Sequence, residues 1–193
     1  MIAEPYRASM TVEEYLALDR ASLDARYEYI DGVVTMMTGG TANHSRVGVN
    51  ITTQLNMALQ DSPCIVYNSD MRVSISATRY VYPDISVSCD IRDQEDGTRD
   101  IMQHPSVIIE VFSPYTEAYD RGKKFEFYRD CSSVQEIALV STDEQAVDLY
   151  RRASKKLWTL HPYRAGDYVE FKSINVTVAI EMFYQKVKLS QSL

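Results

Sequence analysis

The feature that most constrains this chain is a short apolar run with one acid at its centre. Residues 107–112 read Val-Ile-Ile-Glu-Val-Phe and are bounded by Pro105 and Pro114. A run of this length, rich in β-branched residues, is typical of a strand that is buried on both faces of a sheet. Burial of an unpaired ionised carboxylate costs several kcal/mol or more. Glu110 therefore needs a partner, which can be a cation, a metal ion or a proton.

A second acid interrupts a neighbouring strand pattern. Asp84 follows Pro83 within residues 80–88, and the tyrosines, valines and isoleucines of this segment indicate a β-strand. If this strand pairs with the strand that contains Glu110, the two carboxylates lie within reach of one ion. Carboxylate oxygens are suitable ligands for a hard divalent cation. The pair of acids is therefore a candidate metal site.

The totals describe an ordinary globular chain that is acidic overall. It has 193 residues and a mass of 22.1 kDa, which suits one domain with a full hydrophobic core. The formal net charge is -7, so the molecule as a whole repels nucleic acid. Binding of DNA or RNA would need a local basic patch or a bridging metal ion. We expect one domain over residues 1–193.

The cysteines and the amino terminus bear on location. Cys64, Cys89 and Cys131 are widely spaced and form no CxxC pair, which favours reduced cysteines that serve in packing. The first residues lack the apolar core of a signal peptide, and no segment has the roughly 20 apolar residues that span a bilayer. We expect a cytoplasmic protein without membrane contact.

Local patterns predict an α/β domain around a mixed sheet. A capping box at residues 11–14 predicts a short first helix, and Asp31-Gly32 predicts a tight hairpin turn. Apolar residues at helical spacing predict a second helix over 43–59, with His44 near its start. Two more helices are expected over 116–130 and 179–185. The expected strands are 27–30, 33–37, 64–67, 71–76, 80–88, 107–112, 134–140, 146–151, 157–160, 168–171 and 174–178.

Two further patterns carry charge. Asp120, Lys124 and Tyr128 are spaced i, i+4 and i+8, so they line one side of a helix that can bring an ammonium group to the acids. Residues 151–156 read Arg-Arg-Ala-Ser-Lys-Lys and form the densest basic cluster. This cluster fits the turn of a hairpin, where it is either simply solvated or in contact with phosphates.

The order of these motifs resembles the PD-(D/E)XK nuclease superfamily, and more closely its Uma family of restriction-endonuclease-like proteins. The resemblance extends from about residue 10 to residue 185. It implies a restriction-endonuclease-like mixed β-sheet core flanked by helices. The residues that carry it are 27–32, His44, 70–73, 82–87, 109–114 and 120–125.

The resemblance also implies a metal-dependent phosphodiesterase site. Asp84 and Glu110 would bind Mg²⁺ or Mn²⁺, with the backbone carbonyl of Val111 as a further ligand. Glu28 would be an additional ligand or would support the ligands from outside. His44 would lie at a helix start or contact the substrate, and it has no second histidine at the spacing of a zinc site.

The chain departs from the superfamily pattern at one position. The motif lysine should stand two residues after the glutamate, and that residue is Phe112. The resemblance suggests that Lys124 on the next helix replaces it, with Asp120 and Tyr128 beside it. Lys123 is the adjacent candidate, but on a helix it points about 100° away.

These observations favour a Mg²⁺-dependent endonuclease that hydrolyses phosphodiester bonds, with DNA as the expected substrate and RNA as an alternative. A homodimer is expected by analogy, because cutting two strands needs two sites. The first rival is a nuclease-fold protein that binds nucleic acid or a protein partner without cutting. The second is a hydrolase that acts on sugars through two carboxylates without a metal.

Overall fold

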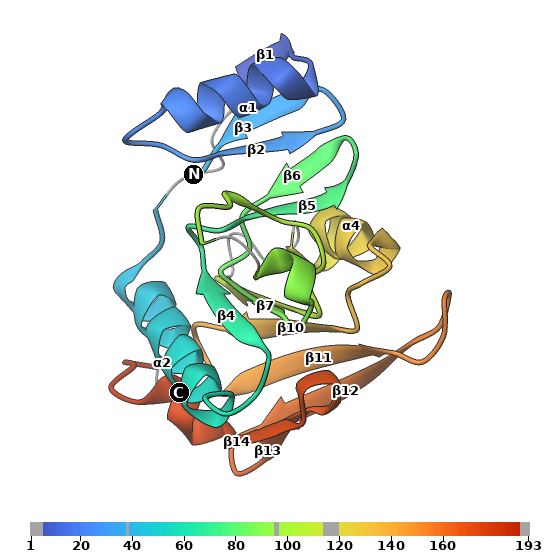
Figure 1. Ribbon diagram of the computed structural model, residues 1–193. Coiled ribbons are helices and arrows are strands. Elements are labelled where there is room, and N and C mark those ends of the chain that lie inside the picture. The colour runs from blue at the N-terminus through green and yellow to red at the C-terminus, as the bar shows by residue number, and fades with distance from the viewer. Residues whose placement is uncertain (1–5, 38, 95–96, 114–119, 190–193) are drawn as a thin grey trace.

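The computed structural model describes residues 6–37, 39–94, 97–113 and 120–189 (Figure 1). Its strands are β1 (Tyr6–Ser9), β2 (Tyr27–Ile30), β3 (Val33–Met36), β4 (Ile65–Asn68), β5 (Arg72–Ser76), β6 (Arg79–Val81), β7 (Ile85–Ser88), β8 (Ile101–Met102), β9 (Val107–Phe112), β10 (Glu136–Ser141), β11 (Ala146–Arg152), β12 (Trp158–Arg164), β13 (Tyr168–Phe171) and β14 (Val176–Ala179). Its helices are α1 (Val12–Ala21), α2 (Ala42–Ala58) and α4 (Phe125–Asp130), with a π-helical turn η2 (Asp120–Lys124) and 3-10 turns η1 (Ile91–Asp93), η3 (Lys172–Ile174) and η4 (Ile180–Tyr184).

The described strands form two larger sheets and a hairpin. The first sheet has the order β1-β3-β2-β6-β5-β8, the second has the order β12-β11-β10-β9-β7-β4, and β13 pairs with β14. In the second sheet β9 and β10 are parallel and the other neighbours are antiparallel. The predicted α/β class with a mixed sheet is confirmed, and both larger sheets of the described residues are mixed.

The amino-terminal elements follow the local signals in the sequence. Thr11 caps α1 by accepting a hydrogen bond from the backbone N–H of Glu14, and the Glu14 side chain returns to the N–H of Thr11. Asp31 and Gly32 have φ values of 49° and 97°, as a type I′ turn requires. Helix α1 packs through Tyr15 on the hairpin of β2 and β3, which lies at the top of Figure 1.

Residues 80–88, predicted as one strand, belong to two strands in different sheets. Strand β6 ends at Val81 and pairs with β2 and β5, whereas β7 begins at Ile85 and pairs with β4 and β9. Pro83 lies between them, and a proline has no N–H to donate to a strand ladder. The chain therefore passes from the first sheet to the second at this point, and Asp84 lies directly before the first residue of β7.

Apolar side chains cover both faces of the second sheet. Helix α2 packs through Val47, Ile51 and Leu55 against one face. On the opposite face, Phe112 and Tyr128 belong to a cluster that also contains residues of the first sheet. Every residue of β9 is buried, as predicted for a strand covered on both sides.

The helix predicted over residues 116–130 takes a different form. Residues 114–119 lie outside the described part, and a π-helical turn over Asp120–Lys124 leads into α4. Single π-helical turns inside helices occur frequently at functional sites. The helix predicted over 179–185 is instead the 3-10 turn η4.

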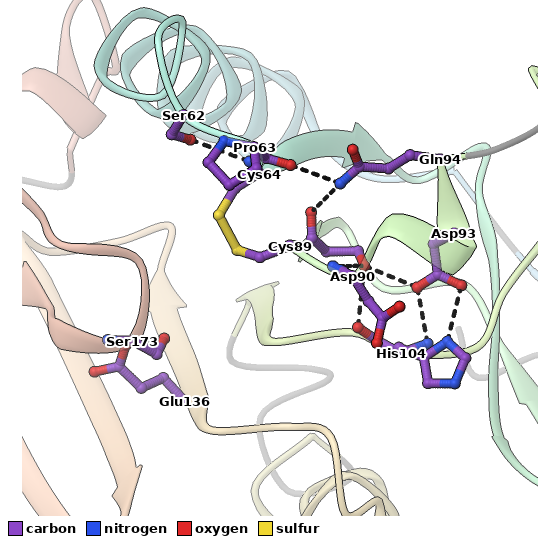
Figure 2. The surroundings of a disulfide bond; sticks show 11 residues. Ser62, Pro63, Cys64, Cys89, Asp90, Asp93, Gln94, His104, Glu136 and Ser173 are labelled. Atoms are coloured by element: carbon purple, nitrogen blue, oxygen red, sulfur yellow. Dashed lines mark hydrogen bonds and ion pairs between the residues drawn. A yellow bond between two sulfur atoms is a disulfide. The ribbon is translucent and has the colours of Figure 1, made fainter.

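The prediction of reduced cysteines is wrong for two of them. Cys64 and Cys89 form a disulfide with their Cα atoms 4.0 Å apart, and Cys131 is free and buried (Figure 2). Strands β4 and β7 pair with Ile65 opposite Ser88, so the two cysteines face each other at the ends of neighbouring strands. Among the described residues, no helix has the length and apolar character needed to cross a bilayer.

Candidate active site

Asp84 is anchored on the main chain beside Glu110. Strands β7 and β9 are antiparallel with Ile85 opposite Ile109. Asp84 directly precedes β7 and so continues this register to a position opposite Glu110. Its Oδ2 accepts a hydrogen bond of 2.8 Å from the backbone N–H of Val111, the residue after Glu110. The two acids thus come from paired strands, as the sequence predicted.

Lys124 brings its ammonium group between two buried carboxylates. Its Nζ lies 2.9 Å from Glu110 Oε1 and 3.2 Å from Glu28 Oε1. The three residues are 7%, 4% and 7% exposed, respectively. Glu28 belongs to β2 of the first sheet and Glu110 to β9 of the second, so Lys124 joins acids from both sheets. Lys123, the alternative candidate, is exposed.

Tyr128 completes the surroundings of Glu110. Tyr128 lies in α4, one helical turn after Lys124. Its hydroxyl donates a short hydrogen bond to Glu110 Oε1. Burial, and then the negative charge of Glu110, raise the pKa of the Tyr128 phenol well above its usual range. The phenol therefore stays protonated and acts as a hydrogen-bond donor.

His44 approaches Asp84 from the other helix. It lies in the first turn of α2, where its backbone N–H donates to the capping side chain of Thr41. Its Nε2 is 3.2 Å from Asp84 Oδ2. The side chains of His44 and Asp84 are 29% and 17% exposed, so this end of the site is open to solvent. Glu110 and Lys124 lie at its closed end.

The position of the superfamily lysine is filled by an aromatic ring. Phe112 is buried, and the guanidinium of Arg121 lies 4.9 Å from its ring centroid. No cationic group from β9 can therefore reach the acids at this position, and the ammonium comes from η2. Asp120 is the first residue of η2, but its side chain lies outside the described part.

The charges of the cluster suit a cation. Asp84, Glu110 and Glu28 carry three carboxylates, whereas Lys124 supplies one ammonium group. Excess negative charge in a buried setting favours a bound cation. Among the described residues, no group of three or more His, Cys, Asp or Glu side chains could hold a metal ion alone. The chemistry of these carboxylate oxygens suits Mg²⁺, which commonly uses one or two carboxylates and takes its other ligands from water and substrate phosphate.

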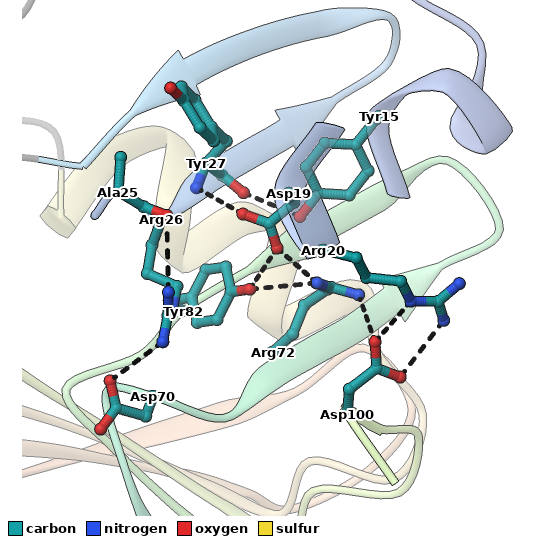
Figure 3. Close-up of polar contacts among 10 residues, drawn as sticks. All are labelled: Tyr15, Asp19, Arg20, Ala25, Arg26, Tyr27, Asp70, Arg72, Tyr82 and Asp100. Atoms are coloured by element: carbon teal, nitrogen blue, oxygen red, sulfur yellow. Dashed lines mark hydrogen bonds and ion pairs between the residues drawn. The ribbon is translucent and has the colours of Figure 1, made fainter. Parts of the chain in front are cut away.

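Sequence reasoning assigned no role to a buried network behind Glu28. Asp19, which is buried, accepts short hydrogen bonds from Arg72 and from the hydroxyl of Tyr82 (Figure 3). The backbone N–H of Tyr82 lies 3.4 Å from Glu28 Oε1 and donates to it. The network thus fixes the segment that joins β6 to β7 and one acid of the cluster. The only signal in the sequence was Arg72 within the motif of residues 70–73.

The basic cluster of residues 151–156 lies at the hairpin turn between β11 and β12, as predicted. Arg151 pairs with the buried Glu136 at 2.7 Å. Arg152 donates to four backbone carbonyls and stacks on Trp158. These two arginines hold the fold together, which leaves Lys155 and Lys156 as the exposed cations of the turn.

Comparisons with known proteins identify the family of this chain. The family model Uma2, whose description reads "Putative restriction endonuclease", matches residues 12–181. The uncharacterized protein slr1290 of Synechocystis is 36% identical over 177 residues, which cover 91% of this chain and 92% of that protein. The uncharacterized protein sll1609 of the same organism is 30% identical, over 78% of this chain and 85% of its own length.

A solved structure shares the fold. It is a crystal structure from Anabaena variabilis, described as "a putative nuclease belonging to DUF820". Its TM-score is 0.75, and the match covers 91% of this chain and 98% of that chain. At 19% sequence identity this likeness supports the fold alone.

Proposed function

The chain belongs to the Uma2 family of restriction-endonuclease-like proteins, and from this premise we propose that it is a divalent-metal-dependent endonuclease that hydrolyses phosphodiester bonds in DNA. The observation that carries the proposal is the contact of Lys124 with both Glu110 and Glu28. It supplies the ammonium group that the superfamily needs and that β9 lacks. Family membership supports a nuclease-like function, and the metal, the substrate and the residue roles are proposed here.

In this proposal Asp84 and Glu110 would hold Mg²⁺ or Mn²⁺, with the carbonyl of Val111 as a further ligand. A divalent cation held there supplies a Lewis acid that lowers the pKa of a bound water and offsets phosphate charge. Tyr128 and the N–H of Val111 keep the two carboxylates oriented. Glu28 balances the charge of Lys124 and would serve as an additional metal ligand.

Lys124 would act from the closed end of the site and His44 from its open end. The ammonium of Lys124 would stabilise negative charge that develops on the phosphate and orient the attacking water. His44 lies at the open end of the site, where it steadies Asp84 and contacts the incoming strand. Cleavage of both strands of a duplex would call for two copies of the chain, which makes a homodimer part of this proposal.

A second candidate is a nuclease-fold protein that binds nucleic acid or a protein without cutting. Phe112 at the lysine position favours it, as does the net charge of -7. The proposed endonuclease differs from it in one measurable respect, namely turnover of a phosphodiester.

The test is cleavage of supercoiled plasmid, single-stranded DNA and RNA by the wild type in Mg²⁺ or Mn²⁺. We expect nicked and linear plasmid with the wild type and none with Glu110→Gln. The control Glu126→Gln removes one exposed carboxylate of α4 and should cut like the wild type. Equal cutting by Glu110→Gln, or no cutting of any substrate by the wild type, would overturn the endonuclease proposal.

A further inference from the structure

A cavity of about 440 Å³ is lined in part by Tyr82, which lies in the segment that joins β6 to β7. Its walls come from the end of α1, the segment before β2, the turn from β4 to β5 and the segment before β8. Figure 3 shows Arg72, Asp19 and Tyr82 together, with Arg26 and Asp70 to one side and Arg20 and Asp100 to the other. Cavities of this size accept small ligands such as a single nucleotide unit.

The lining of the cavity is richer in cations than the rest of the molecule. It contains four arginines (Arg20, Arg26, Arg72 and Arg99) against three aspartates (Asp19, Asp70 and Asp100), in a chain whose net charge is -7. Arginine is the side chain best suited to phosphate, because its planar guanidinium presents several donors in a fixed fork.

One carboxylate already occupies the place of an anion between two guanidinium groups. Asp100 Oδ2 lies 2.7 Å from Arg20 Nε and 3.2 Å from Arg72 Nη1. Arg72 is 4% exposed and is held rigidly by Asp19 and the Tyr82 hydroxyl, so its orientation is fixed before any ligand arrives. The Asp100 side chain is 45% exposed, and a phosphate could take its place.

Arg26 is a second side chain of this cavity that can change its ion pair, in addition to Asp100. Its Nη2 lies 3.8 Å from Asp70 Oδ1, a loose ion pair between side chains that are 39% and 73% exposed. Exposed pairs of this kind are weak and exchange readily. Arg26 can therefore turn toward a phosphate at low cost.

Tyr67 supplies the accessible aromatic ring of the lining. Tyr67 and Tyr82 both border the cavity, but Tyr82 is 2% exposed whereas Tyr67 is partly exposed. Sites for single strands combine cationic side chains with aromatic rings on which bases stack. The backbone N–H of Tyr82 donates to Glu28, which contacts Lys124, so Tyr82 both lines the cavity and is bonded to an acid of the candidate active site.

We propose that this cavity binds one nucleotide of the substrate strand. Arg20 and Arg26 contact the phosphate of that nucleotide, Arg72 provides the fixed cation behind them, and Tyr67 contacts its base or sugar. This inference rests on the proposed endonuclease for its substrate class, but the cavity can be tested without cleavage.

The test measures binding of a short fluorescein-labelled thymidine oligonucleotide by fluorescence anisotropy in EDTA, so that no divalent cation takes part. Arg26→Gln should raise the dissociation constant about tenfold, the usual effect of losing one charge-assisted hydrogen bond. Arg20→Gln should raise it further, since it also leaves Asp100 facing the cavity with one cation fewer. Both side chains are partly exposed, and an unchanged melting temperature verifies that the variants fold.

Arg129→Gln is the matched control, because it removes the same charge from an exposed position of α4 outside the cavity. It should bind the oligonucleotide like the wild type. Binding by both cavity variants at wild-type strength, equal weakening by the control, or no binding by the wild type would each overturn the proposal. Oligonucleotide that binds with the expected losses and is never cut would support the cavity and remove only the endonuclease activity.

Discussion

Lys124 Nζ lies 2.9 Å from Glu110 Oε1, although Glu110 belongs to β9 and Lys124 to η2. In the superfamily pattern the corresponding amine and acid stand two residues apart on one strand. Here Phe112 fills the strand position, and the amine approaches from η2. Under the proposed function, Lys124 supplies from η2 the amine that the superfamily pattern places on the strand.

Replacement of Lys124 should therefore remove cleavage. Lys124→Met keeps most of the buried volume but removes the positive charge, and loss of one such electrostatic contact commonly lowers the rate by 10²- to 10³-fold. The measurement is the initial rate of plasmid nicking in Mg²⁺. Lys123→Met changes the exposed neighbour in the same way and should retain wild-type activity. Equal losses in both variants would contradict the assignment of Lys124.

Asp84 and Glu110 should bind a metal ion in the folded protein and not in the unfolded chain. With Mg²⁺ at about 100 times its dissociation constant, the free energy of unfolding should rise by about 2.7 kcal/mol, which is about 5–10 °C in melting temperature for a chain of this size. Asp84→Asn removes one ligand charge and should abolish the shift, whereas Glu126→Gln should keep it. An undiminished shift in Asp84→Asn would show that the ion binds elsewhere.

Tyr82 should make stability sensitive to alkaline pH. Burial, and then the hydrogen bond with Asp19, raise its pKa to about 12, whereas a tyrosine in an unfolded chain has a pKa of about 10. Between these values the unfolded chain has lost a proton that the folded chain retains, so stability is complete below pH 10 and falls as the pH rises toward 12. Urea unfolding at a series of pH values measures this decline.

Tyr82→Phe provides the comparison. Near neutral pH it should lower the free energy of unfolding by about 1–3 kcal/mol, because it leaves Asp19 and Arg72 with one partner fewer. Above pH 10 its stability should decline less steeply than that of the wild type, although Tyr15 and Tyr128 continue to contribute in the same direction. Parallel curves for the two proteins would contradict the role given to the Tyr82 hydroxyl.

The disulfide should contribute measurably to stability. Cys64 and Cys89 close a loop with a sequence separation of 25, for which loop-closure entropy gives about 3 kcal/mol. Addition of a thiol reductant should lower the free energy of unfolding of the wild type by about this amount. The variant with both cysteines replaced by serine should start at the lower value and show no response. A wild type that is indifferent to reductant would contradict the expectation.

The parts of the fold that the sequence predicted are those determined within a few residues. The capping box at Thr11 and the Asp31-Gly32 turn are local arrangements, and both are present. The burial of β9 on both faces could also be predicted, because Glu110 is the only polar residue of this strand. In each case the physical cause lies in neighbouring residues.

The parts that the sequence did not predict depend on pairing between distant segments. The break at Pro83 could be foreseen as a weak point, but the fact that β6 and β7 enter different sheets depends on their partners β2 and β9. The Cys64–Cys89 bond follows from the register of β4 on β7, which no local pattern encodes. The same limit applied to the site, where Lys124 was inferred from a family resemblance and its second carboxylate, Glu28, was not connected to it.

The contact of one ammonium group with an acid from each sheet has a consequence for the order of events in the cell. A newly made chain whose amino-terminal hairpin has not docked presents Glu110 to Lys124 without Glu28. Under the proposed function, cutting would await the docking of this hairpin, and incompletely folded copies would not cleave DNA.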